Sequence, residues 1–295
     1  MSTFILLTIT GFGLGAMYFL IASGLSLIYG LMGVLNFAHG AFLTVGAYAS
    51  WWTSLHTFGG VHSVLLRFLL GALCGLVAGG IFAALVELIL IRPLYQRHIE
   101  QVLVTVGLSL AATALVQSIW GQDQRAFLTP AWLNKTTTIG GAHIPNDRWV
   151  EIATALVVLV GLNAFLRRTR YGLIIRAGVE NGAMVTALGI DVRRAFTLVF
   201  ALGGVAAAVA GVLSNVYFGT VDPQRGTSLL IFAFIVVVIG GLGSLRGTAV
   251  AAVVVGLVQQ YANYYASSGL GDLSVVLLLG LLLLARPRGL SGSFA

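Results

Sequence analysis

Long apolar stretches follow one another along this chain, separated by short polar breaks. A helix needs roughly 20 apolar residues to cross a bilayer. By this measure we expect spans near 4–29, 36–54, 63–91, 101–120, 150–166, 195–216, 228–245, 247–266 and 272–285. Glycines interrupt several of these stretches, so some should be half-helices, and the number of spans should be about 8 to 10. The pattern predicts an all-α polytopic bundle of transmembrane helices, some of them broken, built from residues 1–295 as a single domain.

The composition supports this interpretation. Of the 295 residues, 58% are apolar and only 8% are charged, and the mean hydropathy is +0.99. A water-facing globule of this size needs far more polar side chains to cover its surface, so a soluble protein is excluded. The first charged side chain is Arg67, and we therefore expect the opening apolar run to be a first span rather than a cleaved signal. Small residues recur at every fourth position and predict close helix contacts: Gly71, Gly75 and Gly79, then Gly203, Ala207 and Gly211.

Most basic residues lie just beyond the ends of apolar runs. The densest group is a polar island over residues 167–194, which holds six arginines and two acidic residues. Loops that carry Lys or Arg near membrane spans resist translocation. Three basic groups are therefore expected to face the cytoplasm: the island, Arg92 with Arg97, and Arg286 with Arg288. With nine spans the C-terminus is inside, the N-terminus is outside and residues 121–149 form an external loop; an N-terminus inside requires one more short helix.

Several kinds of chemistry are missing from the chain. Lys135 is the only lysine and stands in NKTTTIGG, so no G-x-x-x-x-G-K-[ST] phosphate loop exists. The histidines are scattered without metal-ligand spacing, so we expect no metal site and no bound cofactor. Acids inside spans, which mark ion-coupled carriers, are almost missing, and Glu87 is the exception; it is expected to pair with Arg92 or to serve assembly or coupling. Energy for uphill transport should then come from another polypeptide.

Two glycine-rich breaks interrupt the apolar pattern. The first lies in GLSLIYGLMGVLNFAHGAFLTVGAYA at 24–49, and the second in IGGLGSLRG at 239–247. Irregular backbone at membrane depth survives only where it is buried or lines a cavity, and interrupted segments in both halves of a chain point to a repeat-built transporter. The polar and glycine positions of these breaks are candidates for a translocation pathway: Tyr29, Asn36, His39, Gly241 and Ser244. Helix capping and hydrogen bonds within the bundle remain the alternative.

The polar island contains a predicted amphipathic helix from Arg176 to Leu188. Its apolar side chains gather on one face: Val179, Ala183, Met184, Ala187 and Leu188. Gly189 follows in the position of a C-terminal cap. Such a helix fits a groove on a partner protein, although a helix lying on the lipid interface has the same pattern.

In chain order, these segments resemble the branched-chain amino acid ABC importer permease family, the LivH type. The resemblance covers nearly the whole chain. It is carried by YGLMGVLNFAHGAFLTVGAY, by Glu87 with the following IRPL, by TVGLSL at 105–110, by RAGVENGAMVTALGID, by FALGGVAAAVAGVL and by VIGGLGSLRGTAVAAVVVGLV. Each segment alone is weakly specific, whereas the set in this order is specific.

The resemblance implies a subunit of a bacterial inner-membrane importer that is not itself an enzyme. It implies pairing with a second, related permease, two cytoplasmic ATPases that use ATP and Mg, and a periplasmic binding protein that delivers substrate; membrane lipid surrounds the chain, and no nucleic acid is involved. It maps the ATPase-coupling loop onto Arg176–Gly189, with Glu180 and Gly189 at signature positions, and adds Thr105 to the pathway. The E-A-A signature of other ABC importers does not fit, because Glu180 lies nine residues before Gly189.

Three functions remain open at this point. Import of branched-chain or other hydrophobic amino acids is the preferred one. Permeases for urea or short amides carry nearly the same motifs, because the binding protein supplies most of the selectivity. A carrier or channel that works alone is disfavoured by the missing intramembrane acids.

Overall fold

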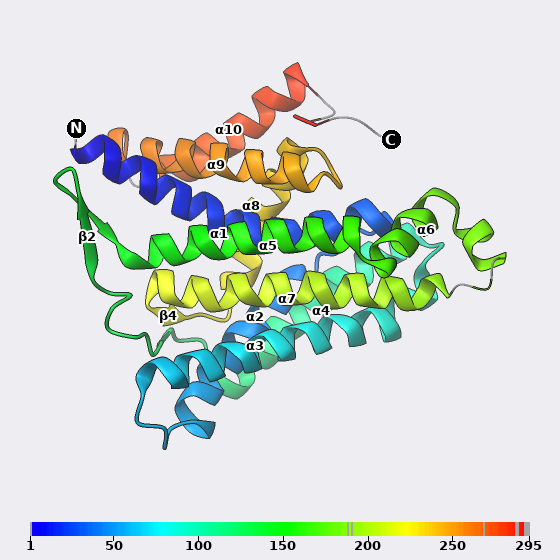
Figure 1. Cartoon of the computed structure of the whole chain (residues 1–295), viewed down its shortest axis with the longest axis horizontal. Coiled ribbons are helices and arrows are strands. Elements are labelled where there is room, and N and C mark those ends of the chain that lie inside the picture. The colour runs from blue at the N-terminus through cyan, green and yellow to red at the C-terminus, as the bar shows by residue number, and fades with distance from the viewer. Residues whose placement is uncertain (1, 188, 190, 268, 287–288, 292–295) are drawn as a thin grey trace.

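The computed structural model describes residues 2–187, 189, 191–267, 269–286 and 289–291, without the side chains of 179–183 and 186–187. This part of the chain is a bundle of helices (Figure 1). The helices are α1 (Ser2–Met32), α2 (His39–Trp52), α3 (Val64–Val86), α4 (His98–Trp120), α5 (Asn146–Arg168), α6 (Arg170–Ala187), α7 (Val192–Phe218), α8 (Arg225–Gly240), α9 (Leu245–Tyr265) and α10 (Leu270–Ala285).

Short strands lie in the connections between helices. β2 (Thr136–Ile139) and β3 (Ala142–Pro145) form an antiparallel hairpin, with Thr136 opposite Pro145. β1 (Arg125–Ala126) pairs with β4 (Thr220–Val221), far away in the sequence. These pairings fill the loop that the sequence predicts as external, and they attach it to the end of α7.

Each of the predicted apolar segments contains one helix, and α6 occupies the polar island. Five described helices are long and apolar enough to cross a membrane alone: α1, α3 with its extension to Leu94, α4, α5 and α7. α8 and α9 meet the same test only together, as a pair bent by 119° at the second break. α2 has 14 residues and continues directly into a π-helical turn at Thr53–Thr57. The expected broken span is found at the second break, and α10 is a further short apolar helix of 16 residues.

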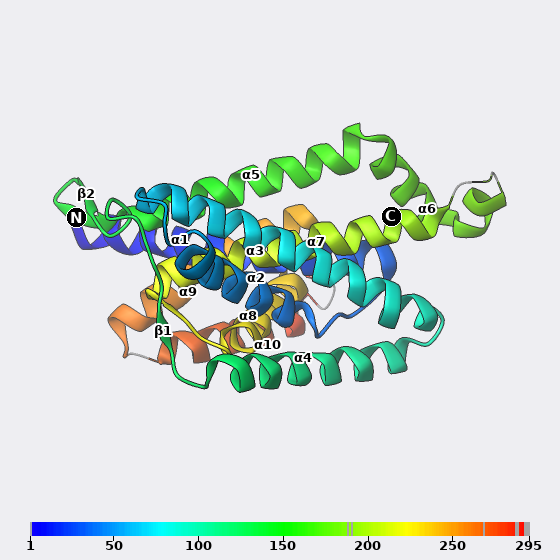
Figure 2. The same cartoon turned by 90° about the horizontal axis from the view of Figure 1, so that it is seen from below.

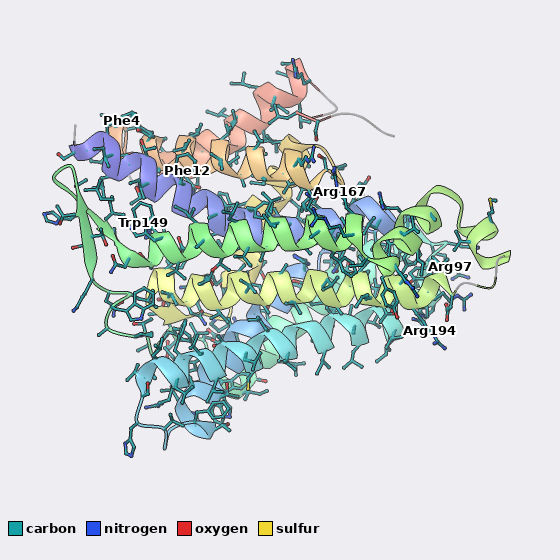
Figure 3. All side chains as sticks on the ribbon, in the orientation of Figure 1. Phe4, Phe12, Arg97, Trp149, Arg167 and Arg194 are labelled. Atoms are coloured by element: carbon teal, nitrogen blue, oxygen red, sulfur yellow. The ribbon has the colours of Figure 1, made fainter. Side chains whose placement is uncertain are left out.

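The bundle has two distinct ends. Figures 1 and 2 place the N-terminus and the β2–β3 hairpin at one end, here the hairpin end, and α6 beyond the other, here the α6 end. Arg97, Arg167 and Arg194 lie toward the α6 end, whereas Phe4 and Trp149 lie toward the hairpin end (Figure 3). These three arginines, two of them from the polar island, therefore lie at the same end, as the charge pattern predicts; Arg288 lies outside the described residues.

Glycine lets the central helices touch through their backbones. A Cβ atom on Gly75 of α3 would lie 2.5 Å from the carbonyl oxygen of Gly46 in α2, and one on Gly79 would lie 2.6 Å from Cβ of Ala208 in α7. On the other side of the core, a Cβ on Gly15 of α1 would lie 2.7 Å from the carbonyl oxygen of Ala252 in α9. Because lipid provides no hydrophobic drive for helix association, such close contacts are what hold helices together. The predicted small-residue stripe on α3 is confirmed as a packing surface.

Candidate functional site

The first break follows α1 directly. Gly33 has a φ of +66°, which an L-amino acid rarely adopts, and the chain stays irregular until α2 begins at His39. Asn36 is fully buried; its side-chain oxygen accepts a hydrogen bond from the Ala38 amide at 3.0 Å, and its Nδ2 has no partner among the described residues. Asn36 therefore makes a local turn just before α2, whose N-cap residue Ala38 has no side-chain cap, and its buried NH₂ group has no acceptor among the described residues.

His39 lies at the start of α2, in the interior of the bundle. Its side chain is fully buried, and its Nε2 is 3.0 Å from the carbonyl oxygen of Ile21 in α1. With the proton on Nε2, Nδ1 is an acceptor, and it has no donor among the described residues. A Cβ atom on Gly24 would lie 2.8 Å from the imidazole Cε1, so glycine on α1 makes room for this ring.

The two breaks lie against each other. A Cβ on Gly30, in the last turn of α1, would lie 2.5 Å from Cα of Gly243 in the second break. Tyr29, next to Gly30, is half-buried; Gly241 is buried with a φ of +94°, and the Ser244 hydroxyl caps α9 by accepting from the Gly247 amide at 3.1 Å. The structure thus brings the predicted pathway positions of the second break beside the end of α1.

Thr105 is placed differently. It is fully buried on α4, and its hydroxyl donates to the Val102 carbonyl of the same helix at 3.0 Å. α4 runs along the edge of the bundle in Figure 2. That Thr105 and the break residues line a translocation pathway stays a prediction.

α6 is longer than the helix that the sequence predicts, and it extends beyond the bundle at its end (Figures 1 and 2). Arg176 and Met184 are exposed on it, and Gly189 has a φ of +77°, as expected after a helix end. The remaining predicted coupling residues lie outside the described side chains, and Leu188 lies outside the described residues altogether: Val179, Glu180, Ala183 and Ala187, with Leu188.

The side of α6 that packs on the bundle is one that sequence analysis did not single out. Ile175 and Val185 are buried, and a Cβ on Gly178 would lie 2.8 Å from Val192 at the start of α7. Tyr171 and Leu173 are large and exposed on the same helix. α6 therefore has one apolar side joined to the bundle and other apolar side chains open to a partner.

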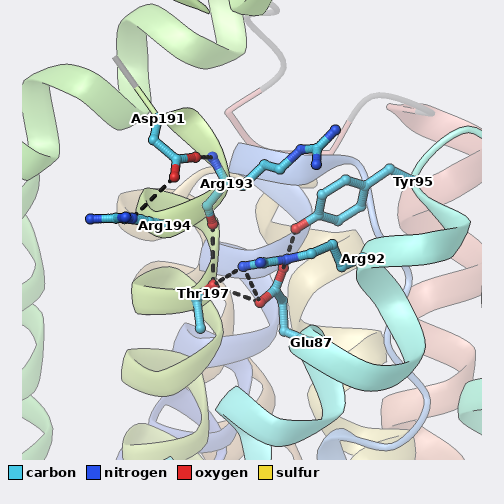
Figure 4. Close-up of polar contacts among 7 residues, drawn as sticks. All are labelled: Glu87, Arg92, Tyr95, Asp191, Arg193, Arg194 and Thr197. Carbon is cyan, nitrogen blue, oxygen red and sulfur yellow. Dashed lines mark hydrogen bonds and ion pairs between the residues drawn. The ribbon is translucent and has the colours of Figure 1, made fainter. Parts of the chain in front are cut away.

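Glu87 is the centre of a polar cluster at the α6 end, here the Glu87 cluster (Figure 4). After α3 the chain widens into a π-helical turn at Glu87–Ile91 and then tightens into a 3₁₀ turn at Arg92–Leu94, and Arg92 and Tyr95 come back onto the carboxylate. Arg92 donates from Nε and Nη2 at 3.3 and 3.4 Å, and the Tyr95 hydroxyl donates to Oε1. Thr197 of α7 donates to Oε2 at 2.6 Å. The predicted pairing with Arg92 is confirmed, and a helix more than 100 positions away completes it.

The hydrogen-bond donors around the Glu87 carboxylate explain why it is stable when buried. The Glu87 side chain has no exposed surface, whereas that of Arg92 is 30% exposed. Each carboxylate oxygen has at least two donors, which is what a buried anion requires. Burial, and then the hydrogen bond to Glu87, raise the pKa of the Tyr95 hydroxyl above its ordinary value, so Tyr95 stays protonated as a donor.

A second cluster of buried charges lies toward the hairpin end, in the first turns of α5, here the Arg148 cluster. Asp147 and Glu151 are both buried, and the Arg148 guanidinium lies 3.3 and 3.4 Å from their carboxylates. A Cβ on Gly13 of α1 would lie 2.6 Å from Cδ of Arg148, and the Tyr217 ring of α7 lies 3.5 Å from the guanidinium carbon. Arg148 therefore stands where α1, α5 and α7 meet.

This cluster corrects one expectation. Acids inside spans are not limited to Glu87, since Glu151 is buried within α5. The last residues of the expected external loop 121–149 are helical, because α5 begins at Asn146; that the loop is external stays a prediction. The D-R-x-x-E spacing, which puts all three charges on one helix face, was the available signal. The argument against a carrier that works alone therefore cannot rest on missing acids.

Comparison with known proteins identifies the family of the chain. The family model described as "Branched-chain amino acid transport system / permease component" matches residues 7–286. The permease protein LivH of the high-affinity branched-chain amino acid transport system of Escherichia coli K12 is 29% identical, over 96% of this chain and 93% of its own length. BraD, a permease of the same description from Pseudomonas aeruginosa, is 29% identical over 96% and 94%.

A second kind of relative also matches. LivM, a further high-affinity branched-chain amino acid transport permease of Escherichia coli K12, is 27% identical over 92% of this chain and 69% of its own length. No solved structure matches. The match over nearly all of the chain, together with the helical bundle and its two breaks, shows that the protein is a transport component and belongs to the branched-chain amino acid transport permease family.

Proposed function

We propose that the chain is the membrane-spanning subunit of an ATP-driven importer for branched-chain or other hydrophobic amino acids. The names of its relatives support this substrate class. The sequence has no phosphate loop of its own, so ATP and Mg belong to partner subunits. Two relatives from one organism, LivH and LivM, support pairing with a second, related permease.

The observation that carries the proposal is α6. It extends past the helix ends, has exposed apolar side chains at Tyr171, Leu173 and Met184, and is flanked by arginines on both sides. A helix of this kind fits a groove on a soluble partner. In the proposed complex, two ATPase subunits bind at the α6 end, which is the cytoplasmic one by its arginines. The hairpin end then faces the periplasm and the substrate-binding protein, and the C-terminus lies inside.

The proposal is tested on the assembled complex in proteoliposomes. We expect Glu180→Arg and Ala183→Gln, both on α6, to abolish ATPase binding and ATP-driven leucine uptake while the chain still inserts. Arg97→Gln serves as the control, because Arg97 lies at the same end and its ion pair with Glu100 is exposed. Unchanged uptake by both α6 variants contradicts the docking role, and uptake by the chain without any ATPase contradicts the importer.

The substrate class needs its own measurement. The cognate binding protein is loaded with leucine, urea or acetamide, and retention of each is measured by calorimetry. Retention of leucine alone supports an amino acid importer, whereas retention of urea or acetamide supports the amide alternative.

A further inference from the structure

α6 packs against the start of α7 at Gly178 and Val192. Asp191 caps α7 by accepting from the Arg193 amide at 3.1 Å, and it holds Arg194 in an ion pair at 3.1 Å (Figure 4). Gly178 of α6 packs against Val192, the first residue of α7. A displacement of α6 therefore reaches the first turn of α7.

Thr197 lies one turn further along α7. Its hydroxyl accepts from Arg92 Nη2 at 2.7 Å and stands 2.6 Å from Glu87 Oε2 and 3.1 Å from the Arg193 carbonyl oxygen. A hydroxyl has one proton, and the shorter contact with a charged acceptor is the stronger. The proton therefore goes to Glu87, and Thr197 bridges the anion and the cation at the end of α3.

The Tyr95 ring adds an apolar contact to the same junction. It packs edge-on against Phe196, with 5.8 Å between ring centroids. Beyond the junction α3 lies on α7 at Gly79 and on α2 at Gly75, with no room for a side chain between them. Densely packed elements of this kind move as a unit rather than deform, and α2 begins at the first break.

We propose that Thr197 and Glu87 are positioning residues that transmit movement of α6 to α3, and through α3 to α2 and the first break. The proposal rests on the proposed function of α6 as the ATPase contact. At this cluster the Thr197 hydroxyl is the polar link from α7, through its bonds with Glu87 Oε2 and Arg92 Nη2, and it sets how α7 is held against the end of α3. Tyr95 bonds the same carboxylate from its own side of the junction, so its hydroxyl stabilises the cluster without linking α3 to α7.

The experiment measures leucine uptake and ATP hydrolysis on the same proteoliposomes of the complete complex. Thr197→Val keeps the shape and removes the hydroxyl, and we expect uptake per ATP to fall about tenfold, as for a lost hydrogen bond to a charged group. Thr197→Ser restores the hydroxyl and should restore the ratio. Tyr95→Phe removes an equivalent bond to Glu87 and should leave the ratio within about twofold.

Thr113→Val is the matched control, because among the described residues the Thr113 hydroxyl bonds the Ser109 carbonyl of its own helix α4 and no other helix. If Thr197→Val is not recovered from membranes, uptake per ATP is measured on Thr197→Ala instead. Three results overturn the proposal: an unchanged ratio in Thr197→Val, equal impairment of Thr197→Ser, or equal loss in Tyr95→Phe. Failure of the wild-type chain to bind its ATPases overturns the proposed function instead, and it is seen before any variant is made.

Discussion

The Glu87 cluster and the Arg148 cluster lie at opposite ends of α7 and bury charge in opposite proportions. In the Glu87 cluster a single carboxylate receives donors from Arg92, Tyr95 and Thr197. In the Arg148 cluster two carboxylates share one guanidinium, whose Nε has no partner among the described residues. In the Glu87 cluster three donor side chains surround one acid, whereas in the Arg148 cluster two acids surround one base.

The difference shows which residue each cluster depends on. A buried ion is stable only when its partners replace the water it has lost. The Glu87 carboxylate keeps two hydroxyl donors if its arginine is removed. Without Arg148, Asp147 and Glu151 have no cation among the described residues, and one hydrogen bond from the residue 148 amide to Asp147, at 2.9 Å, remains. The Glu87 cluster should therefore depend less on its arginine than the Arg148 cluster does, and more on its acid.

The largest effect is expected from Arg148→Met. It leaves two buried carboxylates side by side without a cation, and loss of one partner of a buried ion pair costs about 3 to 5 kcal/mol. Arg92→Met should cost less, about 1.5 to 3 kcal/mol, because Glu87 retains Tyr95 and Thr197. The free energy of unfolding of the purified chain in detergent micelles, from denaturant titration, measures both.

Lys135→Met is the control for losing a positive charge at the same end. Lys135 is exposed in the loop before β2, so its replacement should change stability by no more than about 0.5 kcal/mol. If Arg148→Met is no more destabilising than Arg92→Met, the two clusters do not differ in the way proposed.

The two acids give a second, smaller contrast through isosteric substitutions. Glu87→Gln turns an acceptor oxygen into an NH₂ group facing donors, and we expect a loss of about 1.5 to 3 kcal/mol. Glu151→Gln leaves one acid, Asp147, for one arginine. We therefore expect the free energy of unfolding to change by less than about 1 kcal/mol in either direction. Melting of the two variants in the same detergent compares them directly, and equal losses would show that excess acid is not what distinguishes the Arg148 cluster.

The two clusters also show which features of the fold and the site can be predicted from the sequence alone. Helix positions followed from apolar length, and the breaks followed from glycine, because both signals are local. The pairing of Glu87 with Arg92 was predictable from its position at the end of a span. Thr197 was not, since it lies 110 residues from Glu87 and nothing in the sequence near either residue indicates the contact.

The Arg148 cluster was missed for a different reason. Hydropathy placed the start of the span at residue 150, among the apolar residues, whereas the structure begins α5 at Asn146 and carries its charges into the bundle. Burial there depends on Gly13 of α1 and on Tyr217 of α7, which no window around α5 contains. The apolar face of α6 was similarly incomplete, because Ile175 and Val185 pack on neighbours that only the fold defines.

A smaller loss than that of Glu87→Gln is expected where α7 meets the Arg148 cluster. There the contact is not a hydrogen bond but the face of the Tyr217 ring, 3.5 Å from the Arg148 guanidinium carbon. Removing the ring in Tyr217→Leu should cost about 1 to 2 kcal/mol, whereas Tyr217→Phe, which keeps the π face, should cost less than about 0.5 kcal/mol. Denaturant titration separates them. Because a ring face restrains direction less than the Thr197 hydroxyl does, neither variant should change uptake per ATP, and a fall in that ratio would mean that α7 transmits movement through both of its ends.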